Sequence, residues 1–227
     1  MDISKYKAIF FDFDGTLSPG PLGGYIPKAV LQSNFKLNNA QIQKAKLFEK
    51  ENIKNYFFYS KENVIKDIEE EKKVHQKFYT EMAKFIQIKD LGQFVNFMVD
   101  RRLTQEFELY PDVKSILENI GGKYSLGIIT EGLPSRIQEC RRLGFYNIFE
   151  TVLNSHTLGI SKSDPEIYVL ALQRFGMNPE ESVLIDDSVI FLKIAKEVGL
   201  FTIYLDRKQQ QDSLEFQTIS SLKELQF

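Results

Sequence analysis

Short apolar runs, each ending where polar residues begin, constrain the fold of this chain more than any other feature. The run Ala8-Ile9-Phe10-Phe11 is apolar throughout and stops at Asp12. A strand buried on both faces of a parallel sheet has this uninterrupted character, whereas a strand with one wet face alternates. We therefore expect a buried strand here, and similar strands at four later runs: Leu126 to Thr130, Phe149 to Leu153, Val183 to Ile185 and Phe201 to Leu205.

Helical segments separate the later runs. One helix is expected to begin at Pro111 and end at Gly121-Gly122, and another to begin at Asp164-Pro165 and end at Gly176. Two more are expected to end at Gly144 and Gly199. Proline suits the first turn because its missing N–H is not needed there, and glycine accepts the left-handed backbone that often follows a helix. Strands that alternate with helices predict right-handed crossovers and an α/β fold with a doubly wound parallel sheet.

The region from Ser18 to Glu108 breaks this alternation. It begins with the turn-rich stretch Pro19-Gly20-Pro21-Leu22-Gly23-Gly24, which suits a hinge, and continues as long helices. One stripe at helical spacing predicts an amphipathic helix: Val64, Ile68, His75, Phe78, Met82 and Phe85. We expect a helical domain at 18–108 inserted into an α/β core domain that is formed by 1–17 and 109–227.

The composition is that of an ordinary folded protein. Of the 227 residues, 43% are hydrophobic and 26% charged, and the net charge of −2 gives no field that would gather nucleic acid or an anionic membrane. No run reaches the roughly 18 apolar residues that span a bilayer, and the first residues lack a secretory signal. A single cysteine, Cys140, favours a reducing compartment. We expect a soluble, cytoplasmic protein without nucleic-acid or membrane partners, and the sequence indicates no oligomeric state.

Chemically reactive side chains stand at the carboxyl ends of the predicted strands. They are Asp12 and Asp14 after the first run, Thr130 at the end of the second, Lys162 before a helix, and the pair Asp186-Asp187. In an open parallel sheet, ligands bind at this edge, where loops and helix N-termini converge. We expect these side chains to meet there.

Four converging aspartates need a positive charge. At about 4 Å and an effective dielectric of about 20, each pair of carboxylates repels by roughly 4 kcal/mol, so a cation or a proton must offset the cluster. The chain has only two histidines and one cysteine for zinc, whereas carboxylate and phosphate oxygens suit Mg²⁺. Lys162 and the Thr130 hydroxyl add the cation and donor that a transferring phosphoryl group requires, and Gly15 would let backbone amides approach it.

The residues Phe10-Phe11-Asp12-Phe13-Asp14-Gly15-Thr16-Leu17 resemble the signature of the haloacid dehalogenase-like hydrolase superfamily, in its phosphatase branch. Three further pieces follow in the order that the family shows: Ile128-Ile129-Thr130, Lys162 before Asp164-Pro165, and Val183-Leu184-Ile185-Asp186-Asp187-Ser188. The resemblance covers about Lys5 to Leu17 and Leu109 to Leu205. It implies a Rossmann-like core with a helical cap, here 18–108, inserted after the first strand.

The resemblance also implies a role for each residue. Asp12 would be the nucleophile that forms an aspartyl-phosphate, and Asp14 the acid that protonates the leaving oxygen and later activates water. Asp12, Asp187 and the Asp14 carbonyl would hold Mg²⁺, with Asp186 ligating directly or through water. Thr130 and Lys162 would bind the phosphate of a small phosphorylated metabolite.

Two residues depart from the family pattern. Glu131 follows Thr130 where the family more often has a small polar residue, so we include Glu131 among the candidate phosphate-site residues, unless its side chain points away. Phe191 stands where many members have a second acidic or amide residue, which leaves Asp186 and Asp187 to do that work alone.

Other interpretations are weaker or remain open. The dehalogenase branch lacks an acid at the Asp14 position and needs no metal, so Asp14 argues against it. A phosphomutase shares every core residue and stays open. A receiver domain has its acidic pair first and a shorter chain, and a catalytically silent binding protein is disfavoured by the intact site. Substrate contacts in the cap are not identifiable, although four residues are conceivable: Lys54, Arg101, Arg102 and Tyr25.

Overall fold

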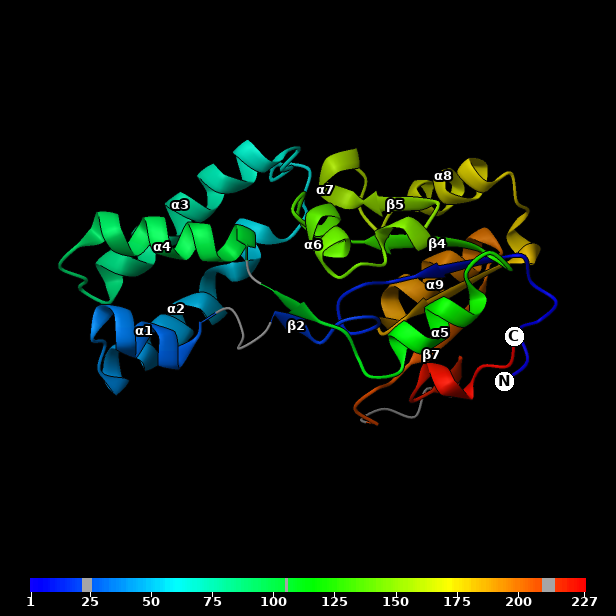
Figure 1. The fold of residues 1–227 in the computed structure, drawn as a ribbon. Helices are drawn as coiled ribbons and strands as arrows, with labels where there is room; N and C mark the ends of the chain where they lie inside the picture. Colours follow the sequence, from blue (N-terminus) through cyan, green and yellow to red (C-terminus); the bar gives the residue numbers. More distant parts are fainter. Residues whose placement is uncertain (22–25, 105, 210–214) are drawn as a thin grey trace.

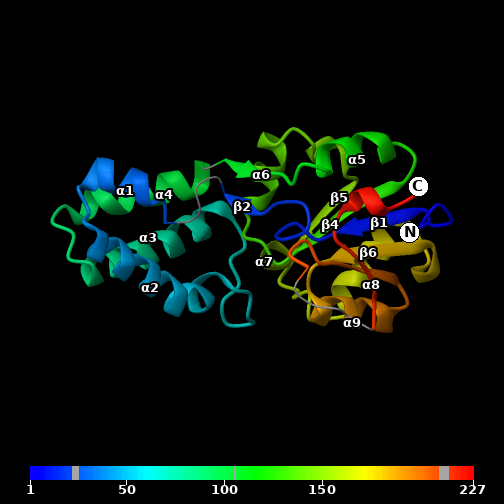
Figure 2. The same ribbon diagram turned by 90° about the horizontal axis from the view of Figure 1, so that it is seen from below.

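The structure, a computed structural model, describes residues 1–21, 26–104, 106–209 and 215–227. In the described residues, parallel strands form a sheet with the order β5-β4-β1-β6-β7-β8, and helices cover both of its faces (Figure 1, Figure 2). The strands are β1 Ala8–Phe11, β4 Ser125–Thr130, β5 Thr151–Asn154, β6 Ser182–Asp186, β7 Phe201–Leu205 and β8 Gln217–Ile219. This arrangement confirms the predicted doubly wound α/β sheet.

Strand β1 lies inside the sheet and sends its side chains to both faces. Ile9 and Phe11 pack with helices α5 (Val113–Ile120) and α6 (Arg136–Arg142), and Ala8 and Phe10 pack with α8 (Glu166–Phe175) and α9 (Val189–Val198). All four residues of β1 are buried. Because neither face is wet, the run has no polar position until it reaches the carboxyl edge.

Two strands differ from the prediction. Strand β5 begins at Thr151, because a 3₁₀ turn at Tyr146–Ile148 comes first and the buried Phe149 precedes the strand. Strand β8 was not predicted, because it has three residues and only Ile219 is buried. An edge strand of this length has too few apolar positions to stand out in a sequence.

The inserted region forms the cap, which we define as residues 26–104. Its helices are α1 Lys28–Phe35, α2 Asn39–Phe57, α3 Ile68–Phe85 and α4 Leu91–Thr104. They lie beyond the sheet and share a hydrophobic core of their own (Figure 1). Strands β2 (Gly20–Pro21) and β3 (Phe107–Glu108) pair antiparallel where the chain leaves and re-enters the core. The domain boundaries at 17/18 and 108/109 stay a prediction, and residues 22–24 of the proposed hinge lie outside the described residues.

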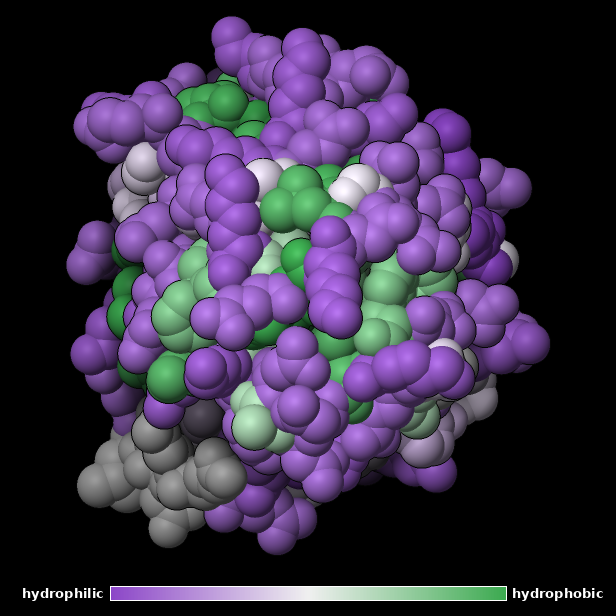
Figure 3. Space-filling model, turned by 90° about the vertical axis from the view of Figure 1, so that its left-hand side faces the viewer, coloured by the Kyte–Doolittle hydropathy of each residue, from purple (hydrophilic) through white to green (hydrophobic). Residues whose placement is uncertain are grey.

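Helix α3 corrects the predicted stripe at both ends. Asp67 caps the helix by accepting from the Glu70 N–H at 2.9 Å, so Val64 precedes the helix. At the other end Phe85 is 47% exposed. His75 lies on the buried face, as predicted. The outer end of the cap is mostly hydrophilic, with hydrophobic side chains gathered near its centre (Figure 3).

No helix among the described residues has both the length and the apolar character needed to cross a membrane.

Candidate active site

A cavity of about 430 Å³ lies between the carboxyl edge of the sheet and the cap. We call its core side the floor, which includes Asp12, Asp14, Thr130, Arg136, Asp186 and Asp187. We call its cap side the roof, which includes Glu49, Ile53, Phe57, Phe58, Phe78 and Tyr79. A volume of this size suits a small organic ligand.

The Lys162 ammonium group joins two buried carboxylates of the floor. Its Nζ lies 2.7 Å from Asp12 Oδ1 and 2.5 Å from Asp186 Oδ2. Burial acts to lower the pKa of Lys162, but the charges of Asp12 and Asp186 outweigh burial and raise it, so the group stays an ammonium. Burial also raises the pKa of Asp12, an effect that Lys162 opposes. The structure thus brings together residues that stand 150 positions apart in the sequence.

The loop that carries Lys162 is held from several sides. Glu131 Oε1 accepts from the Ser161 hydroxyl at 2.8 Å and from the Lys162 backbone N–H, and the Tyr168 hydroxyl donates to the Lys162 carbonyl at 2.9 Å. The ring of Phe191 lies 4.6 Å from Lys162 Nζ, which is a cation–π distance. The Glu131 carboxylate thus braces the loop and also lines the cavity, and its place in a phosphate site stays a prediction.

Three carboxylates lie close enough to share a metal ion. Ligand atoms of Asp12, Asp186 and Asp187 all fall within 4.8 Å of one another. Asp186 already uses Oδ2 on Lys162 and accepts from the Ser188 N–H through Oδ1 at 2.8 Å, so direct ligation would fall mainly to Asp12 and Asp187. Burial, followed by the charge of Asp12, raises the pKa of Asp187 to about 6. A hard divalent cation such as Mg²⁺ fits this all-oxygen, mutually repelling set.

Gly15 makes room for Asp187. A Cβ atom at this position would lie 2.0 Å from Asp187 Oδ2, and the φ of +84° is one that side-chain-bearing residues rarely adopt. Both facts require glycine here. The predicted purpose of Gly15, access for backbone amides, is therefore joined by a second one, space for a candidate metal ligand.

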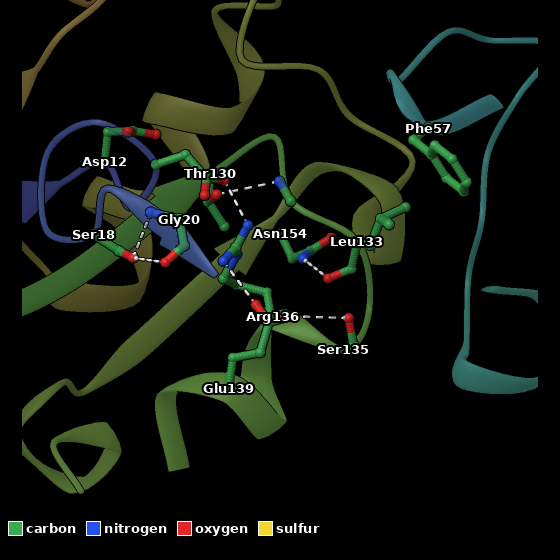
Figure 4. Close-up of polar contacts among 12 residues, drawn as sticks. Asp12, Ser18, Gly20, Phe57, Thr130, Leu133, Ser135, Arg136, Glu139 and Asn154 are labelled. Atoms are coloured by element: carbon green, nitrogen blue, oxygen red, sulfur yellow. Dashed lines mark hydrogen bonds and ion pairs between the residues drawn. The ribbon is translucent and has the colours of Figure 1, made fainter. Parts of the chain in front are cut away.

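The Asp14 side chain stands outside the cluster, although the sequence predicted four converging aspartates. Its Oδ2 accepts from Arg136 Nη2 at 2.5 Å, and the side chain is 47% exposed. The guanidinium of Arg136 also lies 2.7 Å from Glu139 Oε2 and 4.2 Å from the centre of the Phe13 ring. Figure 4 shows Arg136 and Glu139 extending from α6. The cation paired with the candidate acid Asp14 is therefore Arg136, which the sequence did not mark.

The turn after β4 is fixed by hydrogen bonds around Thr130. Its Oγ1 accepts from the Gly132 N–H at 3.1 Å, and its carbonyl accepts from the Ser155 hydroxyl at 3.1 Å. Asn154 donates to the Leu133 carbonyl at 2.8 Å (Figure 4). These contacts hold the Thr130 hydroxyl at the floor, where its proton remains available for a ligand oxygen.

The floor thus carries a lysine-paired aspartate, a second aspartate two residues on, a threonine and an acidic pair. A family model described as haloacid dehalogenase-like hydrolase matches residues 6–199. The chain belongs to this family. The match confirms the resemblance that the sequence motifs indicated.

The haloacid dehalogenase-like relatives include both phosphatases and dehalogenases. The chain is 32% identical over 123 residues to the glyceraldehyde 3-phosphate phosphatase of Methanocaldococcus jannaschii, covering 51% of this chain and 54% of that protein. It is 28% identical over 127 residues to (S)-2-haloacid dehalogenase 4A of Burkholderia cepacia, covering 53% and 55%. The chain therefore spans about half the length of the curated relatives that it matches.

Solved structures show the same fold. A crystal structure of a dehalogenase superimposes with a TM-score of 0.67 at 19% identity, covering 98% of this chain and 96% of that one. At this identity the likeness establishes the haloacid dehalogenase-like fold, cap included, and nothing about the substrate.

Buried polar contacts join the cap of this haloacid dehalogenase-like protein to its core. Glu71 on α3 accepts from both the N–H and the hydroxyl of Ser135, each at 2.7 Å. Arg102 on α4 pairs with Glu139 on α6 at 3.1 Å. Arg102 had been a conceivable substrate contact, and it does line the cavity, but its guanidinium is paired with the core.

A buried histidine makes a second junction between cap and core. His156, on α7 (Ser155–Leu158), accepts from the Ile65 N–H through Nδ1 at 3.1 Å. Its Nε2 lies 3.1 Å from the Phe57 carbonyl and therefore carries the proton of the neutral ring. Burial lowers the pKa of His156, because water cannot solvate a charged ring there. Protonation would also end the role of Nδ1 as acceptor for the Ile65 N–H.

Two of the three remaining conceivable contacts are described, and neither lines the cavity. Lys54 is exposed on α2 and Arg101 is half-buried, and neither lines the cavity among the described residues. Tyr25 lies outside the described residues. Sequence reasoning missed Arg136 and Tyr168, because no local motif marks either residue. Arg136 contacts Asp14 and Tyr168 contacts the Lys162 carbonyl only once the chain is folded.

Proposed function

We propose that the chain is a Mg²⁺-dependent phosphatase that hydrolyses a small phosphorylated metabolite through an aspartyl-phosphate on Asp12. The observation that carries this proposal is the buried Lys162 ammonium, which contacts Asp12 and Asp186 on the floor of the cavity. A carboxylate can attack phosphorus only where positive charge offsets its own, and here that charge is built into the site. The name of the phosphatase relative supports the same reaction class.

The residues of the floor supply two displacements. In the first, an Asp12 carboxylate oxygen attacks phosphorus, the phosphorus–oxygen bond to the alcohol breaks, and Asp14 gives the alcohol its proton. In the second, water attacks the phosphorus of aspartyl-phosphate, Asp14 takes a proton from the water, and the bond to Asp12 breaks to release phosphate. Splitting the hydrolysis in this way eases each step.

The other floor residues bind and orient. Thr130 and Lys162 would hold phosphate oxygens and stabilise charge in the transition state. Asp12, Asp187 and the Asp14 carbonyl would hold Mg²⁺, with Asp186 fixed nearby by Lys162; the ion, when bound, would offset the charge of the carboxylates and phosphate. Arg136 orients the Asp14 carboxylate, which has to turn from the guanidinium toward the leaving oxygen.

Asp14 separates this proposal from dehalogenation. Displacement of a halide needs no proton on the leaving group, so an acid two residues beyond the nucleophile has no task in that reaction. Release of an alkoxide does need one. The Asp14 carboxylate lines the cavity 2.5 Å from Arg136, which supports such a task once the carboxylate turns toward the leaving oxygen.

The test is the hydrolysis of p-nitrophenyl phosphate by the purified chain with Mg²⁺, and again with EDTA. We expect nitrophenol release that depends on Mg²⁺. When the reaction is quenched in acid and the protein digested, we also expect to find the phosphoryl group on Asp12. Halide release from 2-chloropropionate serves as the parallel assay for dehalogenation. Halide release without phosphate release would refute the proposal, as would turnover that EDTA leaves unchanged.

A further inference from the structure

The roof of the cavity differs from the floor in its chemistry. Helix α2 contributes Glu49, Ile53 and Phe57, which are spaced by four residues and therefore share one face of the helix. Helix α3 adds Tyr79 and Phe78, whose ring centre lies 5.0 Å from that of Phe57. Phe58 also lines the cavity and is 55% exposed. Among the described residues, the roof is thus lined by aromatic rings and one carboxylate, together with the His75 imidazole and the paired Arg102 guanidinium.

The charges that line the cavity are unevenly paired. Arg102 pairs with Glu139, and Arg136 pairs with both Asp14 and Glu139. In contrast, no hydrogen bond or ion pair to another described residue holds the Glu49 carboxylate. The charge of Lys46 acts on its pKa without forming an ion pair. Burial raises the pKa of Glu49 to about 7, against a small opposing effect of Lys46. Among the described residues, both guanidinium groups that line the cavity are therefore paired, whereas the Glu49 carboxyl group is not.

We infer that the roof binds an ammonium group, so that the substrate is a phosphomonoester whose alcohol carries an amine. This inference rests on the proposed function for the phosphate end of the ligand. Glu49 would be the counter-ion of the ammonium, which would donate to its carboxylate. The aromatic rings that line the same part of the cavity would add attraction for a cation through the negative quadrupole of their faces. A carboxylate and aromatic rings on a half-buried wall together favour a cation over a neutral group.

The geometry of α2 sets the distance between the two ends of the substrate. Phe57 is the last residue of α2, and its carbonyl faces the core at His156, whereas Glu49 lies eight residues earlier. At 1.5 Å per residue, Glu49 is roughly 12 Å farther along the helix axis. The amine therefore has to be several bonds from the phosphate, with an apolar segment between them against Ile53 and the rings.

A chain-length series tests this inference. We would measure kcat/KM for ω-aminoalkyl phosphates against alkyl phosphates of matching length, from three to eight carbons. We expect a preference of about tenfold or more for the amine, confined to the lengths that reach Glu49. Binding of the matching phosphonates, measured by calorimetry, gives the same comparison without turnover.

Two variants of one helix locate the effect. Glu49→Gln should remove the preference for the amine in both assays, because it deletes the charge and keeps the size of the side chain. Glu51→Gln, exposed on the same helix, should retain the preference. A wild-type chain without preference at any length would overturn the inference, as would a Glu49→Gln variant that keeps it, or a preference for hydroxyalkyl phosphates instead. If the chain still hydrolyses p-nitrophenyl phosphate in those cases, the proposed phosphatase activity stands. If the chain does not hydrolyse p-nitrophenyl phosphate but binds the amine phosphonates selectively, only the phosphatase proposal is refuted.

Discussion

The floor and the roof of the cavity handle charge differently. On the floor, Lys162 lies between Asp12 and Asp186, and Arg136 lies between Asp14 and Glu139, so each cation is shared by two carboxylates of the same domain. On the roof, Glu49 lines the cavity together with aromatic residues and has no such partner among the described residues. From this difference we expect the floor to carry out the same two displacements on any phosphomonoester, and the roof to select the rest of the substrate molecule. Changes to the floor should then slow every phosphomonoester, to a degree set only by its leaving group, while changes to the roof should alter the preference for the rest of the molecule.

The largest effect is expected at the nucleophile. Asp12→Asn should reduce turnover of every phosphomonoester by about 10⁴-fold or more, because an amide does not attack phosphorus. The fold should persist, since the amide is isosteric. Rates with p-nitrophenyl phosphate and circular dichroism would check both points, with the exposed Asp100→Asn on α4 as the matched control. Activity near that of the wild type would remove Asp12 from the role.

Lys162→Met should damage stability and activity together. The change leaves Asp12 and Asp186 buried without their cation, which costs about 3–5 kcal/mol in the free energy of unfolding. The matched control is Lys193→Met, which removes a surface pair with Glu215 whose side chains are 52% and 49% exposed, and such pairs contribute little. Urea denaturation of the two variants gives the comparison. Equal midpoints would show that Lys162 does not stabilise the floor.

Asp14→Asn should slow turnover by about 10²-fold, and unequally among leaving groups. Nitrophenolate leaves without a proton, whereas an alkoxide does not, so alkyl phosphates should suffer more than p-nitrophenyl phosphate. The ratio of the two kcat values in variant and wild type measures this. A uniform loss would mean that Asp14 acts only on the water step, and no loss would reassign the acid.

The sequence predicted the floor well because its residues sit at strand ends. Once Ala8–Phe11 and Ser182–Asp186 are neighbouring parallel strands, Asp12 and Asp186 must lie at the same edge. The exception is instructive. Asp14 leaves the cluster because Arg136, on the first turn of α6, competes for its carboxylate, and nothing in the local sequence marks Arg136 as a neighbour.

The roof could not be predicted in the same way. Its helices were expected, but the residues that face the core depend on how the cap packs, which periodicity does not specify. Glu49 is one of many charged residues on α2, and only the packed structure shows that it faces the cavity while Lys54 does not. The misplaced end of the α3 stripe at Phe85 has the same cause, because a helix surface can be apolar without being covered.

The smallest expected effect concerns the junction that holds the roof over the floor. Burial lowers the pKa of His156 from its ordinary value of 6.5, so below that pH the unfolded chain binds a proton that the folded chain refuses. Stability conferred by this contact is therefore complete above about pH 6.5 and declines as the pH falls. Protonation would also remove the Nδ1 acceptor of the Ile65 N–H.

Comparison with His156→Gln isolates this effect. Burial lowers the pKa of His75 too, and raises the pKa of Glu49, which acts in the opposite direction, so the pH profile of the wild type alone is a sum of several groups. The wild type should unfold at a higher temperature than the variant at pH 7.5, and the difference should shrink by about 2–4 °C at pH 5.5. A difference that stays constant between these pH values would show that His156 titrates normally, and that the junction between roof and floor is insensitive to acid.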